Sequence, residues 1–140
     1  MPRYLTGPLL AALAALGACA TDSMRSKQTL LEETLRAYAA TIRWGEIAQA
    51  QAFLDPKVLQ AHPPTALELE RFRQVKVSGY DEQPAVPTGE NEVRQVVQID
   101  LVNVNTQAAR SIVDRQVWRY DEEARRWWLV SGLPDISRRD

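Results

Sequence analysis

The spacing of apolar residues changes once along this chain, close to Phe72. Before Phe72, apolar residues recur every three or four positions, which is the spacing of one face of a helix. The clearest such set is Leu31, Leu35, Tyr38 and Ile42. After Phe72, apolar and polar residues alternate, as they do in strands with one buried face. Helices followed by a run of neighbouring strands predict an α+β fold with an antiparallel sheet.

The helical part is expected to form a hairpin of two helices. The first helix is predicted from Lys27 to Arg43, and Trp44-Gly45 ends it, because glycine suits a left-handed stop. A shorter helix follows from Glu46 to about Leu54 and is closed by Asp55-Pro56. We expect the apolar sides of both helices to pack on the sheet.

The sheet is expected to contain about four strands. The predicted strands are Val75–Tyr80, Val93–Val104, Ala109–Tyr120 and Trp127–Val130. A loop carrying Pro84, Pro87 and Gly89 separates the first two, because proline cannot donate to a ladder of hydrogen bonds. On the first strand, Val75, Val77 and Gly79 are expected to share one face.

The two long strands carry the polar residues Asp100, Asp114 and Gln116, and their pairing register decides which of them meet. If paired residue numbers sum to an even number, Asp100 and Asp114 share a face as a carboxylate pair. If the sum is odd, Asp100 shares a face with Arg115 and Arg119. Asp114 and Gln116 then join the apolar face, made of Val97, Ile99, Leu101, Ile112, Trp118 and Tyr120. We favour the odd register, because like charges opposed across strands are destabilising.

Asp114 is the candidate catalytic residue in the odd register. A carboxylate in an apolar cavity has its pKa raised by desolvation, which suits a general acid or base near neutral pH. Tyr120 or Gln116 would then polarise a substrate. The structural alternative, which we favour, is that Asp114 is paired by an arginine or hydrogen-bonded to a tryptophan indole or to the helix hairpin.

The aromatic residues have two interpretations. Trp44, Trp118, Tyr120, Trp127 and Trp128 could line a ligand pocket, but such residues more often pack a core. Because Trp127 and Trp128 are adjacent on a strand, one of them should lie on the outer face. The residues assigned to a pocket or core are Trp44, Val97, Ile99, Leu101, Ile112 and Trp118.

The beginning of the chain resembles a bacterial lipoprotein signal. Arg3 precedes an apolar run from Leu5 to Leu16, which is shorter than the roughly 20 residues that span a bilayer. The run ends in Leu16-Gly17-Ala18-Cys19, which resembles a lipobox, in which the leader is cut before the cysteine and the cysteine becomes an N-acyl diglyceride cysteine. The resemblance implies a signal peptide at 1–18 and lipidation of Cys19. Ala20 implies the outer membrane, with the domain facing the periplasm.

Ala20–Ser26 is small and polar and is expected to be a tether, so that residues 27–140 form the single domain. Seven extended residues reach at most about 25 Å, which would hold the domain close to the membrane. The alternatives to a lipoprotein signal at the beginning of the chain are an ordinary signal peptide with a chance cysteine, or a buried apolar helix.

Composition excludes several classes of function. The chain has 17 Lys and Arg residues against 18 Asp and Glu residues, without the basic excess of a nucleic-acid binder. One histidine, His62, and one cysteine suggest no metal site, and no cofactor is expected. His62 precedes Pro63-Pro64 and is expected to be a solvated loop residue, with proton transfer as the alternative. Thr65–Arg71 is expected to add a helical turn or two, started by a capping box of Thr65 and Glu68.

Several short motifs together resemble the small lipoproteins of the nuclear transport factor 2-like superfamily. They are Trp44-Gly45-Glu46, Phe53-Leu54-Asp55-Pro56, Trp118-Arg119-Tyr120, Trp127-Trp128-Leu129 and Gly132-Leu133-Pro134. The resemblance implies a cone, in which a curved antiparallel sheet wraps around a long helix. Members include ketosteroid isomerase-like and polyketide cyclase-like enzymes as well as domains without activity. A sheet face in this class often dimerises, so the resemblance also allows a homodimer.

Two functions remain open. The first is a membrane-anchored, non-catalytic domain that binds a protein partner or an apolar small ligand in the cell envelope. The alternative is a ketosteroid isomerase-like or cyclase-like enzyme that uses Asp114.

Overall fold

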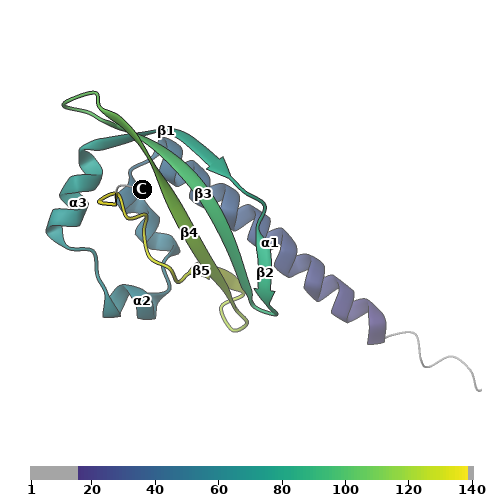
Figure 1. Ribbon diagram of the computed structural model, residues 1–140. Coiled ribbons are helices and arrows are strands. Elements are labelled where there is room, and N and C mark those ends of the chain that lie inside the picture. The colour runs from purple at the N-terminus through teal and green to yellow at the C-terminus, as the bar shows by residue number, and fades with distance from the viewer. Residues whose placement is uncertain (1–15, 139–140) are drawn as a thin grey trace, which may run out of the picture.

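The computed structural model describes residues 16–138, and side chains from Met24 onward. Four helical elements come first and five strands follow (Figure 1). The helical elements are α1 (Leu16–Trp44), the 3₁₀ helix η1 (Ile47–Phe53), α2 (Pro56–Ala61) and α3 (Ala66–Arg73). The strands are β1 (Val75–Glu82), β2 (Val86–Gly89), β3 (Glu92–Asn103), β4 (Ala109–Asp121) and β5 (Arg126–Leu129). The predicted α+β class is confirmed.

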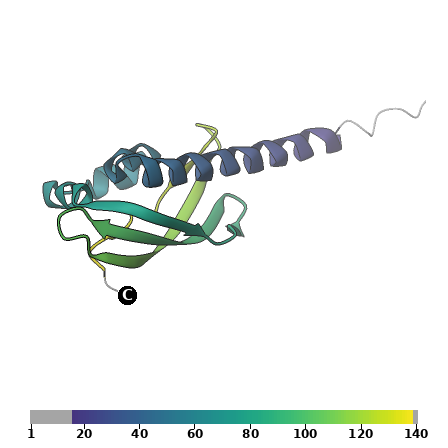
Figure 2. The ribbon, with the colours of Figure 1, turned by 90° about the horizontal axis from the view of Figure 1, so that it is seen from above.

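All strands join one antiparallel sheet in the order β1-β3-β4-β5, and β2 pairs with the same edge of β3 as β1 does. The sheet curls into a half-barrel, and α1 runs along its concave side (Figure 2). The chain therefore forms a cone-like domain whose sheet is four strands wide.

The core lies between α1 and the concave face of the sheet. Tyr38 of α1 is fully buried, and its ring meets the ring of Trp118 edge-on at 5.1 Å. Phe53 of η1 completes this aromatic group, 5.4 Å from Tyr38. Each large ring removes a wide apolar surface from water, so this contact fixes how the helices sit on the sheet.

The predicted end of the first helix is confirmed, because α1 stops at Trp44, but Gly45 does not adopt the left-handed conformation that was predicted for it. A Cβ on Gly45 would lie 2.8 Å from the Thr41 carbonyl oxygen, so only glycine fits this turn without a shift. The shorter helix predicted from Glu46 to about Leu54 is present as η1, a 3₁₀ helix that starts at Ile47. Its apolar side, with Ile47 and Ala50, is buried.

Asp55-Pro56 begins a helix rather than closing one, which corrects the prediction. The Asp55 side chain accepts a hydrogen bond of 2.8 Å from the Lys57 backbone N–H, and proline is well suited to the first turn of α2. The expected capping box of α3 is present: Thr65 Oγ1 accepts from the Glu68 N–H at 3.2 Å, and Glu68 Oε2 accepts from the Thr65 N–H at 2.7 Å.

Two strand predictions need correction. A bulge at Ser78 shifts the register of β1, so Tyr80 rather than Gly79 continues the inner face after Val77. The segment predicted as a loop contains the short strand β2, in which Pro87 is tolerated because β2 lies at an edge.

Ala20–Ser26, predicted as an extended tether, is part of α1. In a helix these seven residues rise only about 10 Å instead of the 25 Å expected of an extended chain. This end of α1 projects beyond the sheet (Figures 1 and 2). Most of the predicted signal peptide, residues 1–15, and the side chain of Cys19 lie outside the part that the structure describes. Over the described residues, no helix is both long and apolar enough to cross a membrane.

Candidate functional site

Asp114 lies inside the cone. Val97 pairs with Asp114, and Ile99 pairs with Ile112, so the odd register that we favoured is confirmed. The Asp114 side chain faces inward and is only 9% exposed, and its neighbour Gln116 is 1% exposed. The Asp114 carboxylate therefore lies in the apolar interior, where an ionised group is costly unless it has a hydrogen-bond or ion-pair partner.

Gln116 holds the polar groups of the interior together. Its side-chain amide donates hydrogen bonds to Asp114 Oδ2 at 3.0 Å and to the Tyr80 hydroxyl at 3.1 Å. Its carbonyl accepts one from the Trp118 indole at 3.0 Å. Both the amide group and the carbonyl of Gln116 are therefore hydrogen-bonded, whereas the Asp114 carboxylate accepts from a single neutral donor, Gln116, among the described side chains. The structural alternative had expected an arginine or a tryptophan indole to pair with Asp114, and within residues 24–138 neither does so directly.

Tyr38 adds a second under-satisfied group. Its hydroxyl is buried and has no hydrogen-bond partner among the described residues. Burial raises the pKa of Tyr38, and the nearby Asp114 carboxylate raises it further. We call Tyr38, Tyr80, Asp114 and Gln116 the Asp114 cluster.

Burial raises the pKa of Asp114 to about 6, against a smaller lowering by the Gln116 hydrogen bond. The pKa of Tyr80 is also raised, mainly by burial. A carboxyl group that titrates near neutrality beside two protonated phenols could take up or release a proton at physiological pH.

Tyr120 does not belong to this cluster, which corrects its expected role beside Asp114. The two residues are six positions apart on β4, or about 20 Å along a strand. Tyr120 instead packs on Trp127, with ring centroids 5.3 Å apart, and its ring lies 5.0 Å from Lys27 Nζ. Tyr38 and Tyr80, which the sequence analysis did not assign to a site, occupy the place expected of Tyr120. The bulge that turns Tyr80 inward has no clear signal in the sequence.

The residues assigned to a pocket or core divide into two groups. Five of them are at most 2% exposed and form the core around the Asp114 cluster: Val97, Ile99, Leu101, Ile112 and Trp118. Trp44 is 79% exposed at the end of α1, so a core position for it is wrong. It follows Ile42 by two positions and so leaves the buried face of the helix.

Asp100 shares the outer face of the sheet with Arg115 and Arg119, as expected in the odd register, but neither arginine pairs with it. Its carboxylate accepts hydrogen bonds from the Ser111 hydroxyl at 2.5 Å and from the Gln98 amide at 3.2 Å, rather than pairing with a cation. These bonds lower the pKa of Asp100. Trp128 lies on this face as expected of one of the paired tryptophans, with the Arg126 guanidinium 3.7 Å from its ring centroid.

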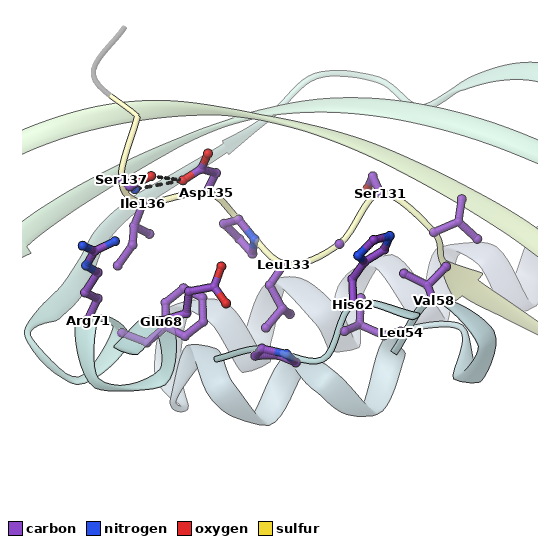
Figure 3. A pocket seen from close by; sticks show the side chains of 15 residues that line it. Leu54, Val58, His62, Glu68, Arg71, Ser131, Leu133, Asp135, Ile136 and Ser137 are labelled. Carbon is purple, nitrogen blue, oxygen red and sulfur yellow. Dashed lines mark hydrogen bonds between the residues drawn. The ribbon is translucent and has the colours of Figure 1, made fainter. Parts of the chain in front are cut away.

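A hollow of about 420 Å³ opens between α2, α3 and the segment 130–137 (Figure 3). We call it the α2–α3 hollow. Its apolar lining includes Leu54, Val58, Phe72, Leu133 and Ile136. Figure 3 shows Arg71 beside Ile136 at one end and the exposed His62 near Val58 at the other.

Of the described charged side chains around this hollow, the two carboxylates form hydrogen bonds and the arginine does not. Glu68 is engaged in the cap of α3, and Asp135 accepts hydrogen bonds from Ser137, which lower the pKa of Asp135. The Arg71 side chain has no hydrogen bond or ion pair within residues 24–138. A free cation therefore borders an apolar hollow.

The C-terminal wall of the α2–α3 hollow is fastened to the sheet. The Arg110 guanidinium on β4 donates to the backbone carbonyl of Ile136 and, at 3.1 Å, to that of Arg138. The Val117 N–H donates to the Ser131 hydroxyl at 3.0 Å. The hollow is thus formed in advance rather than shaped by a loose tail.

No family model, curated protein or solved structure matches this chain. A function therefore has to be argued from the geometry. Within the described residues, no three His, Cys, Asp or Glu side chains gather to hold a metal ion. The Asp114 cluster offers proton exchange in a closed interior, and the α2–α3 hollow offers an open apolar surface with a free cation.

Proposed function

We propose that this chain is a lipoprotein of the outer membrane, acylated at Cys19, with a cone domain of the nuclear transport factor 2-like type. In this proposal the domain is not an enzyme and binds a small apolar ligand in the α2–α3 hollow. The lipobox-like Leu16-Gly17-Ala18-Cys19 supports the anchor. The curled sheet around α1 supports the cone.

The preformed apolar hollow is the observation that carries the binding function. Its volume of about 420 Å³ lies within the range of small-molecule sites, which is roughly 300–1,000 Å³. A preformed site saves the ligand the cost of ordering the protein around it. The free guanidinium of Arg71 suits a ligand that also carries one acidic group.

A second candidate function is proton-transfer catalysis by Asp114. The raised pKa of about 6 and the unpartnered Tyr38 hydroxyl favour it. Against it, Asp114 is only 9% exposed and lines neither the α2–α3 hollow nor the two hollows beside Trp44. We therefore place binding first.

The binding function is tested with the dye 1-anilinonaphthalene-8-sulfonate, an apolar anion, on the purified chain. Val58→Glu puts a negative charge into the apolar lining and should weaken binding of the dye at least about tenfold, since desolvating an unpaired charge costs several kcal/mol. The matched control is Leu67→Glu, because Leu67 is exposed on α3 and does not line the hollow. Equal binding by the Val58 variant and the control would contradict the proposal. Circular dichroism checks that the Val58→Glu and Leu67→Glu variants remain folded.

The anchor is tested separately in a bacterial host. The chain should incorporate labelled fatty acid and sediment with the outer membrane, and Cys19→Ser should abolish both. Labelling that persists in the Cys19 variant would overturn the assignment of Cys19 as the acylated residue.

A further inference from the structure

Two hollows meet at the exposed side chain of Trp44. One, of about 510 Å³, lies between the end of α1, the start of η1, the end of α3 and the first residues of β1. The other, of about 460 Å³, lies between the C-terminal half of α1 and Glu82 at the far end of β1. Both are lined by Arg43 and Trp44. The two hollows lie side by side on either side of Arg43 and Trp44, and we call them together the Trp44 groove.

Trp44 is the most exposed large apolar side chain of the described region, at 79%. The Arg43 guanidinium lies 5.0 Å from the centroid of its ring, so one face of the indole is already occupied by a cation. A second exposed apolar residue, Val104, also borders the groove. Tryptophan and arginine are the residues that most often dominate the energy of protein interfaces.

The larger hollow has a charge bias, whereas the smaller one is balanced, with Arg36 and Arg43 against Glu32 and Glu82. The larger hollow is lined by three cations, Arg43, Arg73 and Lys76, and by a single carboxylate, Glu46. Arg73 makes only an exposed ion pair of 3.4 Å with Glu70. Lys76 forms no ion pair or hydrogen bond through its side chain within residues 24–138. The floor between these charges is apolar and includes Ile42, Ile47, Phe72 and Val75.

The groove also follows an open sheet edge. β1 is the terminal strand of the sheet order, and the groove contacts it at Val75–Val77 and at Glu82. A terminal strand presents backbone N–H and C=O groups that no neighbouring strand uses, and extended peptides commonly bind along such an edge. The length of the groove and this edge suit an extended chain better than a compact small molecule.

We infer that the Trp44 groove binds an extended acidic segment of a partner protein. The carboxylates of that segment lie against Arg43, Arg73 and Lys76, and one of its apolar side chains packs on the free face of Trp44. This site shares only Phe72 with the α2–α3 hollow, and the residues changed in the two tests line one hollow each, so it stands or falls independently of the small-ligand function.

The position of the groove also favours a protein, rather than the membrane that would hold the anchor, as its occupant. Trp44 is 25 residues after Cys19 in the same helix, or about 38 Å along its axis. A helix that rises from the membrane at Cys19 carries the groove away from the surrounding headgroups and towards proteins of the periplasm.

The test is a selection from a random octapeptide library displayed on phage, with the full chain as bait. Peptides that combine Asp or Glu with one Leu, Phe or Trp should be enriched. A synthetic copy of the strongest peptide should bind at least about tenfold more weakly to Trp44→Ala, the size expected for removal of an interface tryptophan. Lys76→Glu should also weaken binding at least about fivefold.

The matched controls are Trp128→Ala and Lys57→Glu, since neither residue lines the groove. Recovery of no peptides, recovery of basic or uncharged peptides, or binding unchanged in the Trp44 and Lys76 variants would each overturn the inference. A parallel arm measures binding to vesicles of phosphatidylglycerol. Vesicle binding that requires Trp44 without selection of acidic peptides would assign the groove to anionic lipid and also overturn the inference.

Discussion

Asp114→Asn should stabilise this protein at neutral pH, although it removes a buried residue that forms a hydrogen bond. The Asn side chain retains an oxygen that accepts from Gln116, as Asp114 Oδ2 does at 3.0 Å. What disappears is the cost of holding a negative charge in the apolar interior. The pKa of Asp114 is raised from its ordinary value of 3.8 to about 6 by that burial.

The magnitude follows from the size of the pKa shift. A rise of roughly two units at about 1.4 kcal/mol per unit corresponds to about 3 kcal/mol. Because the folded-state pKa is the higher one, the unfolded chain loses its proton first as the pH rises. The free energy of unfolding therefore falls between about pH 4 and pH 6 and stays lower above that range.

The assay is urea unfolding followed by circular dichroism at several values between pH 4 and pH 8. The variant should exceed the wild type by about 3 kcal/mol at pH 8 and match it near pH 4. Carboxyl groups with lowered pKa values, such as Glu92 and Asp121, lose stabilising interactions in acid, but they are common to both proteins and cancel in the difference.

Asp100→Asn is the matched control, since Asp100 lies on the outer face and its pKa is lowered. That variant should lose rather than gain stability at neutral pH, because it removes the charged acceptor of the Ser111 hydrogen bond. A difference between Asp114→Asn and wild type that does not change with pH would refute desolvation as the cause. So would destabilisation at pH 8, which would show that the ionised carboxylate has a favourable partner.

Two further predictions concern the groups around the proposed sites. Tyr38→Phe removes a buried hydroxyl without a hydrogen-bond partner, so it should raise the free energy of unfolding by about 1 kcal/mol in urea titrations, whereas a loss would indicate an interaction of this hydroxyl. Arg110→Ala should release the C-terminal wall of the α2–α3 hollow, seen as faster hydrogen exchange over residues 131–138 and weaker dye binding, while Arg115→Ala on the outer face should change neither.

The element order and the strand register could be predicted because they depend on apolar spacing. The alternation of Val97, Ile99 and Leu101 allowed only one face of β3 to be buried, and pairing the apolar faces then placed Asp114 inside. The end of α1 was predicted at the right place for the wrong reason, since Gly45 is not left-handed but stands where a side chain would meet a backbone carbonyl.

The missed features depend on contacts between distant residues. The bulge at Ser78 exchanges the faces of Gly79 and Tyr80, and nothing in the alternation of β1 marks it. A Cβ on Gly79 would lie 2.5 Å from Asp100 Oδ2, so the glycine leaves room for a carboxylate on a neighbouring strand. The α2–α3 hollow was missed as well, because it combines helices with a C-terminal segment that Arg110 holds in place from β4.

The helical start of α1 changes what the proposed anchor would do. At Lys27 the helix is joined to the body of the domain, since Lys27 Nζ lies 2.8 Å from Glu122 and the Lys27 carbonyl accepts from the Trp127 indole at 3.0 Å. Cys19 precedes Lys27 by eight helical residues, or about 12 Å. An extended tether would leave the distance between Cys19 and the domain variable, whereas a continuous helix fixes that distance. The Trp44 groove at the other end of α1 would then stay about 38 Å along the helix from the proposed anchor, and the anchor and the groove would move as one rigid unit.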